Sequence, residues 1–258
     1  MKTAIIVQAR MTSTRLPGKI MKEVMGKPLL EYQVERIKRV KSKDEIVIAT
    51  TRGDADRVIV DFCDRVSISC FRGSEQDVLS RYYEAAKAFN ADVVVRLTSD
   101  CPLIDPSIVE RVIRHYFDHS GDHDYVSNCL VRTYPRGMDT EVFPVRVLEE
   151  GFREASDPQD REHVTPFIYR QPQRYRLSNV AYHRDCSSHR WTVDTEEDFV
   201  LIKRILEALY PAKPEFSAED VLDLVERDPA LSAINAHVEQ KKIDSTSKDN
   251  QRGRRSDG

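Results

Sequence analysis

The sequence contains few cysteines, and their arrangement excludes two common kinds of small-protein scaffold. The five cysteines among 258 residues are an odd set, and no two of them form a Cys-x-x-Cys pair. A disulfide framework or a structural zinc site is therefore not expected. We expect instead a protein of the reducing cytoplasm. The cysteines are Cys63, Cys70, Cys101, Cys129 and Cys186.

Long apolar runs and an excess of positive charge are also missing. The first apolar run covers only residues 4–7 and is soon followed by Arg10, which is too short for a signal peptide or a membrane span. The formal net charge is −3 with 32% charged residues, so no general basic field is present. We therefore expect no targeting segment and no membrane or nucleic-acid partner.

What the chain does contain is a regular alternation of strand-like and helical patterns. Apolar runs at residues 4–7, 45–49 and 93–97 alternate with helical patterns at residues 28–40, 54–65, 75–89 and 106–117. This alternation predicts βαβ units and a doubly wound, largely parallel sheet of the α/β class. Pro28 is expected at the first position of its helix, and Asp105 before Pro106 is expected to cap the next one.

The pattern changes at about residue 124, where the segments become shorter and more mixed. A turn at residues 134–137 and a strand at 139–144 suggest a small antiparallel insertion over about residues 124–185. Strands at 175–180 and 190–193 and helices at 195–209 and 218–227 would complete one domain of residues 1–240. Residues 241–258 have almost no apolar side chains and are predicted to form a disordered tail.

A basic loop directly after the first strand is the strongest functional signal. Arg10, Arg15 and Lys19 lie within this loop together with Ser13 and Thr14. Because open α/β sheets bind ligands beyond the carboxyl ends of their strands, these cations predict a polyphosphate site. Any one of them alone could equally be a solvated surface charge. The spacing matches neither a Walker loop nor the dinucleotide-binding fingerprint.

Two aspartates are candidates for chemistry further along the chain. Asp100 follows the apolar strand at 93–97, where it could bind Mg²⁺ or simply form a turn before Cys101-Pro102. Asp194-Thr195 starts a helical pattern, and Thr195 with Asp198 has the spacing of a capping box.

The run from Ala9-Arg10 to Lys19 resembles the signature loop of the CMP-sugar synthetases, the cytidylyltransferases that act on acylneuraminate and 3-deoxy-manno-octulosonate. Within that superfamily it is most similar to the spore coat polysaccharide (SpsF-like) branch. Relatives that make GDP-sugars usually have Gly-Gly in place of Ala9-Arg10, which favours the cytidylyl branch. The resemblance implies the Rossmann-like fold of nucleotide-diphospho-sugar transferases.

The resemblance also implies roles for particular residues. It assigns catalysis to Arg10, Lys19 and Asp100, and it makes Asp194 the second ligand of a Mg²⁺ ion held with Asp100. The residues implied for nucleotide binding are Ala9, Arg10, Ser13, Thr14, Arg15, Lys19 and Thr98.

The predicted insertion supplies candidate contacts to the second substrate. An acidic pair two residues apart on a strand could bind sugar hydroxyls or an amine, and an arginine could bind a carboxylate or phosphate. Each of these residues alone could also be a surface charge, and the histidine could be a hydrogen-bonded core residue. The candidates are Asn128, Arg132, Arg136, Asp139, Glu141 and His163.

The sequence therefore leads to one main expectation and two alternatives. The main expectation is a Mg²⁺-dependent cytidylyltransferase that joins CTP to a sugar acid or related sugar for surface polysaccharide synthesis, and the resemblance implies a homodimer. A glycosyltransferase is the first alternative, although its Asp-x-Asp motif is missing at Asp100, and Asp122-His123-Asp124, which fits by spelling, lies in a predicted loop. The second alternative is a non-catalytic nucleotide-binding subunit.

Overall fold

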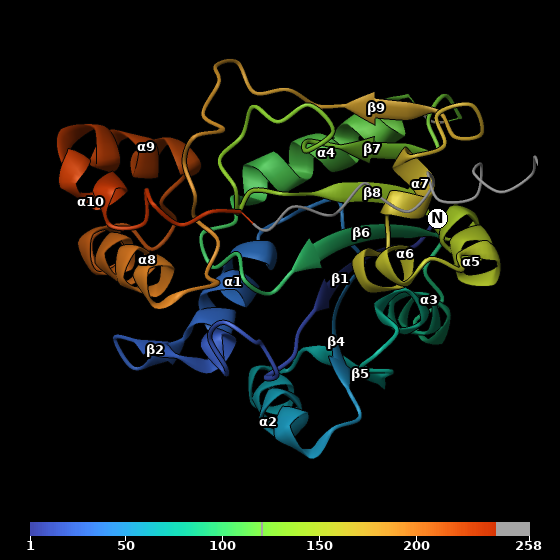
Figure 1. Cartoon of the computed structure of the whole chain (residues 1–258), viewed down its shortest axis with the longest axis horizontal. Helices are drawn as coiled ribbons and strands as arrows, with labels where there is room; N and C mark the ends of the chain where they lie inside the picture. The colour runs from blue at the N-terminus through green and yellow to red at the C-terminus, as the bar shows by residue number, and fades with distance from the viewer. Residues whose placement is uncertain (120, 241–258) are drawn as a thin grey trace, which may run out of the picture.

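A seven-stranded sheet organises the protein, which we describe from a computed structural model covering residues 1–119 and 121–240 (Figure 1). The predicted tail at 241–258 lies outside the described residues. The strand order in space is β5-β4-β1-β6-β8-β7-β9. The strands are β1 (Thr3–Gln8), β4 (Glu45–Thr51), β5 (Ser69–Gly73), β6 (Val93–Thr98), β7 (Tyr125–Ser127), β8 (Glu141–Pro144) and β9 (Leu177–Asn179).

One half of this sheet is parallel and consists of β1, β4, β5 and β6. β1 pairs in parallel with both β4 and β6, and β4 pairs in parallel with β5. Gln8 at the end of β1 lies opposite Thr98 at the end of β6. The predicted doubly wound parallel sheet is therefore confirmed, and the loops that follow β1 and β6 start side by side at its carboxyl edge.

The antiparallel part extends the same sheet. β8 pairs antiparallel with both β6 and β7, while β9 pairs in parallel with β7. The β6–β8 register places Arg96 directly opposite Glu141. A separate hairpin of β2 (Glu23–Val24) and β3 (Lys27–Pro28) lies outside this sheet.

The predicted strand at residues 190–193 is wrong. Arg190 makes only an isolated bridge with Arg136. The amide of Trp191 donates to the Arg136 carbonyl and the amide of Val193 donates to the Asp100 carbonyl, 2.8 and 2.9 Å away. Because these backbone groups bond to two different loops, no neighbouring strand pairs along the segment.

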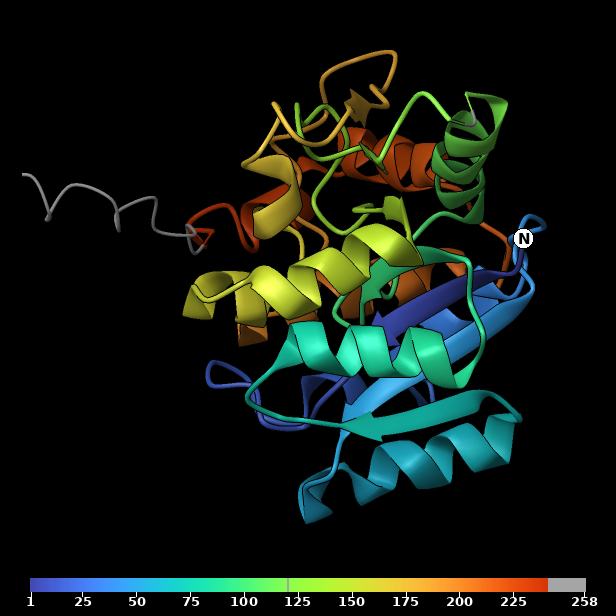
Figure 2. The same cartoon turned by 90° about the vertical axis from the view of Figure 1, so that its right-hand side faces the viewer.

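Helices cover both faces of the sheet. Ile5, Val7 and Val95 point to the face covered by α1, α2 and α4, whereas Ile6 and Val94 point to the face covered by α3 and α5. Figure 2 shows α3 and α5 lying next to each other across that second face. The helices are α1 (Leu29–Ile37), α2 (Arg57–Val66), α3 (Val78–Ala88), α4 (Pro106–Asp118), α5 (Val145–Glu154), α6 (Pro158–His163), α7 (Pro166–Tyr169), α8 (Glu196–Leu209), α9 (Ala218–Arg227) and α10 (Pro229–Ala233).

The helix α8 belongs to a third apolar cluster beside the sheet. Trp191, Ile202 and Val221 are among its buried members, and α8, α9 and α10 lie together at one side of the molecule (Figure 1). Across the described residues, every helix is too short or too polar to cross a membrane.

Local capping signals explain where several helices begin. Asp105 accepts a hydrogen bond from the Ser107 amide and Pro106 opens α4, as the sequence predicts. Pro28 instead precedes its helix: it is extended (ψ 151°), pairs in the small hairpin and leaves Leu29 to begin α1. The expected position of Pro28 is thus wrong by one residue.

Candidate functional site

The loops after β1 and β6 border a cavity of about 230 Å³ at the carboxyl edge of the parallel strands. Ala9, Arg10, Ser13, Thr14, Arg15, Lys19 and Thr98 all line this cavity, as do Asp100 and Asp194. The tertiary structure thus brings together every residue for which the resemblance implies a role with nucleotide or metal. We call this space the phosphate cavity.

The loop after β1 has a fixed shape. The Met11 carbonyl accepts hydrogen bonds from the amides of Ser13 and Gly18, both at 2.9 Å. The Met11 amide donates to the buried carboxylate of Asp56, 2.7 Å away, which ties the loop to the short 3₁₀ helix η2 (Asp54–Asp56). Gly18 adopts φ +69°, a conformation that favours glycine, and the 3₁₀ helix η1 (Lys19–Met21) begins at the next residue.

Two aspartates and several cations meet inside the phosphate cavity. The Lys19 ammonium lies 2.7 Å from Asp194 Oδ1 and 3.6 Å from Asp100 Oδ2. A guanidinium nitrogen of Arg15 lies 3.0 Å from Asp194 Oδ2, and one of Arg190 lies 2.7 Å from the same oxygen. Three cations therefore converge on the one carboxylate of Asp194.

This convergence fixes the charge states of the central pair. Burial alone would raise the pKa of Asp194, yet Lys19 and Arg15 hold it below its ordinary value. Burial alone would lower the pKa of Lys19, yet Asp100 and Asp194 raise it. Both groups are therefore charged at neutral pH.

The start of α8 explains why Asp194 points into the cavity. Thr195 and Asp198 form the predicted capping box, which is confirmed. The fully buried Asp198 carboxylate also accepts from the Asp194 amide at 2.9 Å and from Arg190 Nε at 3.0 Å. Because the Asp198 carboxylate accepts the hydrogen bonds of the backbone amides in this turn, the Asp194 carboxylate does not bond to them and pairs with Lys19 instead.

The chemistry of the two aspartates fits a magnesium ion that arrives with phosphate. Asp100 Oδ2 and Asp194 Oδ1 already converge on one cation, the Lys19 ammonium, and Thr98 Oγ1 donates to Asp100 Oδ1 at 2.5 Å. In the part of the chain that the structure describes, no group of three or more His, Cys, Asp or Glu residues is arranged to hold a metal. Mg²⁺ commonly takes one or two carboxylates plus substrate phosphates, so this pair fits it together with a nucleotide.

Two arginines of the site were missed by the sequence analysis. Arg190 was read only as part of a strand, although it is 7% exposed and bonds both Asp194 and Asp198. Arg81 on α3 is 1% exposed, lines the phosphate cavity and donates to the Ser74 carbonyl at 2.5 Å. Burial, reinforced by the charge of Arg10, lowers its pKa. The sequence did contain a signal for Arg81, because this charged residue lies on the apolar face of the helix predicted at residues 75–89.

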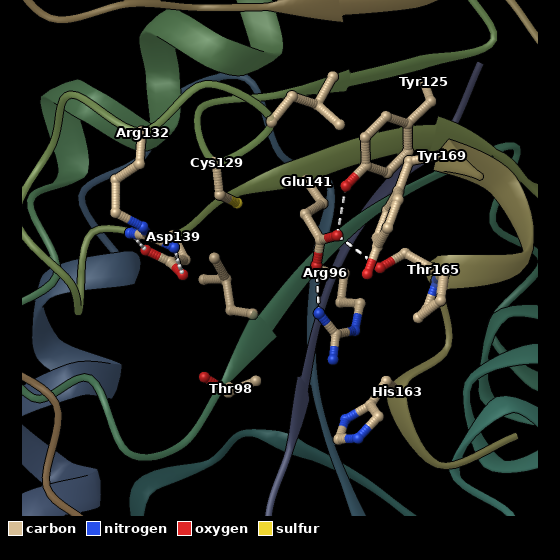
Figure 3. Close-up of a pocket in the computed structure, with 13 residues that line it drawn as sticks. Arg96, Thr98, Tyr125, Cys129, Arg132, Asp139, Glu141, His163, Thr165 and Tyr169 are labelled. Atoms are coloured by element: carbon tan, nitrogen blue, oxygen red, sulfur yellow. Dashed lines mark hydrogen bonds and ion pairs between the residues drawn. The ribbon is translucent and has the colours of Figure 1, made fainter. Parts of the chain in front are cut away.

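A second cavity, of about 380 Å³, adjoins the first (Figure 3). Thr98 and His163 line both cavities. We call the second space the acceptor cavity, because four of the six candidate acceptor residues line it: Arg132, Asp139, Glu141 and His163.

Two ion pairs dominate the acceptor cavity, as the dashed lines in Figure 3 show. The two terminal nitrogens of Arg132 lie 2.5 and 2.7 Å from the two carboxylate oxygens of Asp139. The buried Glu141 accepts from Arg96 and Tyr125, and from Thr165 Oγ1 at 2.6 Å. Burial, followed by the charge of Glu141, raises the pKa of Tyr125 well above its ordinary value.

Two predicted acceptor residues lie outside both cavities. Asn128 is 1% exposed. Its side-chain Nδ2 donates to the Met138 carbonyl and its Oδ1 accepts from the Thr140 backbone amide, so it closes the turn before β8. Arg136 lines a different cavity next to Trp191. We therefore no longer count either residue as an acceptor contact.

Comparison with known proteins gives a consistent result. Residues 4–248 match the family model described as cytidylyltransferase. The spore coat polysaccharide biosynthesis protein SpsF of Bacillus subtilis is 34% identical over 87% of this chain and 94% of its own. A solved cytidylyltransferase from Leptospira borgpetersenii superposes with a TM-score of 0.86 at 35% identity, covering 90% of this chain and 97% of that one.

A more distant structure shares the fold. The CMP:2-keto-3-deoxy-manno-octonic acid synthetase, solved in complex with CTP, superposes with a TM-score of 0.62 at 18% identity over 81% of this chain and 99% of that one.

Proposed function

Since the chain belongs to the cytidylyltransferase family and is a nucleotidyltransferase, we propose that it joins CTP to a sugar or sugar acid in a magnesium-dependent reaction. The products would be a CMP-sugar and pyrophosphate. The observation that carries this proposal is the meeting of Lys19 with Asp100 and Asp194 in a cavity that Arg10 and Arg15 also line.

The basic residues of the phosphate cavity would hold the triphosphate of CTP. Arg10, Arg15 and Arg81 offer guanidinium groups and Lys19 offers a compact ammonium. In the transfer, the leaving pyrophosphate gains negative charge, which these fixed cations would stabilise. Lys19, now paired with the two aspartates, would exchange part of that pairing for a phosphate oxygen.

Asp100 and Asp194 are the residues that would hold Mg²⁺. When bound, the ion would neutralise charge on the phosphates and help to orient them. Thr98 keeps Asp100 turned toward the cavity through the hydrogen bond to Oδ1.

The acceptor would enter from the adjoining cavity. Its hydroxyl oxygen would form a bond to the α-phosphorus of CTP, while the bond from that phosphorus to the bridging oxygen breaks and pyrophosphate leaves. Thr98 and His163 line both cavities, so the two substrates would meet beside them. The proton of the hydroxyl would pass to Asp100, the carboxylate hydrogen-bonded to Thr98.

The similarity to SpsF supports a product used for surface polysaccharide. We propose that the enzyme acts in the cytoplasm as a homodimer. Sedimentation of the full chain at micromolar concentration tests the dimer, and a monomer under those conditions would refute it.

No observation favours the glycosyltransferase alternative. The Asp-x-Asp spelling at residues 122–124 ends at Asp124, which is 5% exposed and accepts hydrogen bonds from the Arg176 amide and Nε at 3.0 and 3.1 Å. Asp124 also lines neither the phosphate cavity nor the acceptor cavity.

Thermal unfolding with CTP, UTP, GTP or ATP, each with and without Mg²⁺, tests the nucleotide. A ligand that binds only the folded protein stabilises it by about 2.7 kcal/mol at one hundred times its dissociation constant. We expect a selective, magnesium-dependent rise with CTP that Asp100→Asn abolishes. Pyrophosphate release with CTP, Mg²⁺ and a sugar then tests turnover and separates a catalyst from a binding subunit. No stabilisation by any triphosphate would refute the proposal.

A further inference from the structure

We propose that a third cavity, between Arg136 and Arg190, is a separate binding site for a sugar phosphate. The cavity has a volume of about 350 Å³ and lies beside α8 and α10 (Figure 1). Sites for small molecules commonly have about 300–1,000 Å³. We call this space the Arg136 cavity. The inference goes beyond the proposed function, which assigns no ligand to it.

The first observation is that Arg136 enters this cavity as a cation without a partner. Its side chain is half-buried, yet within residues 1–119 and 121–240 no group accepts a hydrogen bond from the guanidinium. Arg132, four residues earlier, is paired with Asp139. A charge that is partly removed from water and left unpaired is unfavourable, so a ligand anion would supply what the protein does not.

The second observation is the positive charge of the walls. Arg136 and Arg190 both line the cavity, whereas no Asp or Glu of the described ranges does. Burial, followed by the charge of Arg132, lowers the pKa of Arg136. The guanidinium nevertheless stays charged, because its ordinary pKa is above about 12. An anion in this space would therefore face two cations and no resident carboxylate.

The third observation is that Arg190 has one nitrogen to spare for a ligand. Nε and one terminal nitrogen of Arg190 bond Asp198, and that terminal nitrogen also bonds Asp194. The other terminal nitrogen donates to the amide oxygen of Gln240, an uncharged acceptor. A phosphate oxygen would replace Gln240 there without breaking either aspartate pair. Hydrogen bonds between two charged groups are the stronger kind, and the guanidinium fork suits phosphate.

The backbone holds Arg136 in place for such a ligand. Its amide donates to the His189 carbonyl at 3.0 Å, and its carbonyl accepts from the Trp191 amide at 2.8 Å. Gly137 follows with φ +103°, and a Cβ there would lie 2.9 Å from the Trp191 carbonyl oxygen. This close approach requires glycine and fixes Arg136 beside Trp191 before any ligand arrives.

The remaining walls suit the sugar part of the ligand. Ser188 and Ser232 bring hydroxyl groups to the cavity, while Trp191 and Leu201 bring apolar surface. A sugar phosphate carries its charge at one end and presents hydroxyl groups and apolar C–H faces at the other. It therefore matches a cavity with two guanidinium groups, two hydroxyls and an aromatic wall better than inorganic phosphate does.

The test follows the fluorescence of Trp191, which is the only tryptophan of the chain and lines the Arg136 cavity. The full-length protein is titrated with ribose 5-phosphate in the absence of CTP and metal, and with ribose and inorganic phosphate for comparison. We expect a saturable change with ribose 5-phosphate and none with ribose. Inorganic phosphate should bind roughly tenfold more weakly, because it lacks the hydroxyl contacts.

Variants locate the site. Arg136→Gln removes one charge-assisted contact and should raise the dissociation constant of ribose 5-phosphate roughly tenfold or more. Arg10→Gln alters the phosphate cavity instead and should leave this constant unchanged. Arg153→Gln, which loses an exposed ion pair with Glu149 on α5, is the matched control. Thermal unfolding checks that each variant is folded.

The outcomes separate this inference from the proposed function, because the titration requires neither CTP nor turnover. No saturable change with ribose 5-phosphate overturns the inference, and so does an equal affinity for inorganic phosphate. A change that Arg10→Gln abolishes and Arg136→Gln leaves intact places the ligand in the phosphate cavity and also overturns it. If Arg136→Gln does not fold, the wild-type and Arg10→Gln titrations still decide. A failure of pyrophosphate release with CTP would count against the proposed function alone.

Discussion

Replacing Asp194 by asparagine should change stability and nucleotide binding in opposite directions. Asp194 accepts from Lys19, Arg15 and Arg190 within 3.0 Å. Asparagine keeps the size of the side chain and one acceptor oxygen but removes the negative charge. The variant therefore leaves a cluster of cations without its central counter-charge.

The size of the stability loss follows from burial. The side chains of Lys19 and Arg190 are 12% and 7% exposed, so their pairs with Asp194 are poorly screened, while Arg15 at 38% adds little. Removing one partner of a buried ion pair costs about 3–5 kcal/mol. Because Arg190 keeps Asp198, we expect the low end, about 3 kcal/mol. For a chain of this size that corresponds to roughly 6–12 °C in melting temperature.

Metal-free nucleotide binding should become tighter in the same variant. In the wild type the Asp194 carboxylate competes with a triphosphate for Lys19 and Arg15 and repels it. A unit charge at 4 Å is worth about 1 kcal/mol in water and about 4 kcal/mol near a protein surface. We therefore expect CTP to bind roughly tenfold more tightly without Mg²⁺, while the added effect of Mg²⁺ and the turnover are lost.

The pH dependence provides an internal check. The native pKa of Asp194 lies below its ordinary value, so its stabilising effect is present above the unfolded pKa of about 3.9 and is lost as the pH falls through the lower native pKa. The difference between wild type and variant should therefore shrink below about pH 4. Urea unfolding and calorimetric titration with CTP measure both effects, with Glu149→Gln as the control. An unchanged unfolding free energy together with unchanged metal-free affinity would refute this reasoning.

Three further predictions follow from single contacts. Gly73→Ala would place a Cβ 2.8 Å from Arg81 Cγ, so it should weaken CTP binding by roughly tenfold in calorimetry while the protein stays folded; unchanged affinity would contradict a role for Arg81. Glu141→Gln leaves Arg96 buried without its counter-charge and should cost about 3 kcal/mol in urea unfolding, whereas a loss under 1 kcal/mol would show that the pair is not needed. Burial alone would raise the pKa of Asp124, but its partners Arg176 and Arg146 lower it to about 2. The ionised Asp124 should therefore stabilise the protein by up to about 2 kcal/mol at neutral pH. That contribution should vanish as the pH falls from about 4 to about 2. If Asp124→Asn still had a lower free energy of unfolding than the wild type at about pH 2, the prediction would be wrong.

Local patterns in the sequence were enough to predict the parallel sheet and the residues of the phosphate cavity. Apolar runs mark strands because buried parallel strands need apolar side chains on both faces. The carboxyl ends of β1 and β6 then meet at one edge, since parallel strands in register end together. The basic loop and Asp100 follow those two ends directly, so their meeting required no knowledge of distant contacts.

Asp194 was placed by resemblance, and the structure supplies the physical reason for its position. The capping box of Thr195 and Asp198 is a local signal, readable from spacing alone. That the turn faces Lys19, far away in the sequence, depends on the Val193 amide bonding to the Asp100 carbonyl. No periodicity in the sequence encodes that hydrogen bond.

The acceptor cavity was decided by the tertiary structure. Asn128 and Arg136 have the side chains of ligand contacts, but one is consumed by backbone groups and the other faces a different cavity. Whether Arg132 is a free cation or half of an ion pair depends on where its loop brings it relative to Asp139. The sequence by itself thus determined the fold class and the phosphate loop, because both follow from neighbouring residues. Only the folded chain determined the charge presented to the second substrate, because charge in a cavity depends on which residues from separate segments pair there.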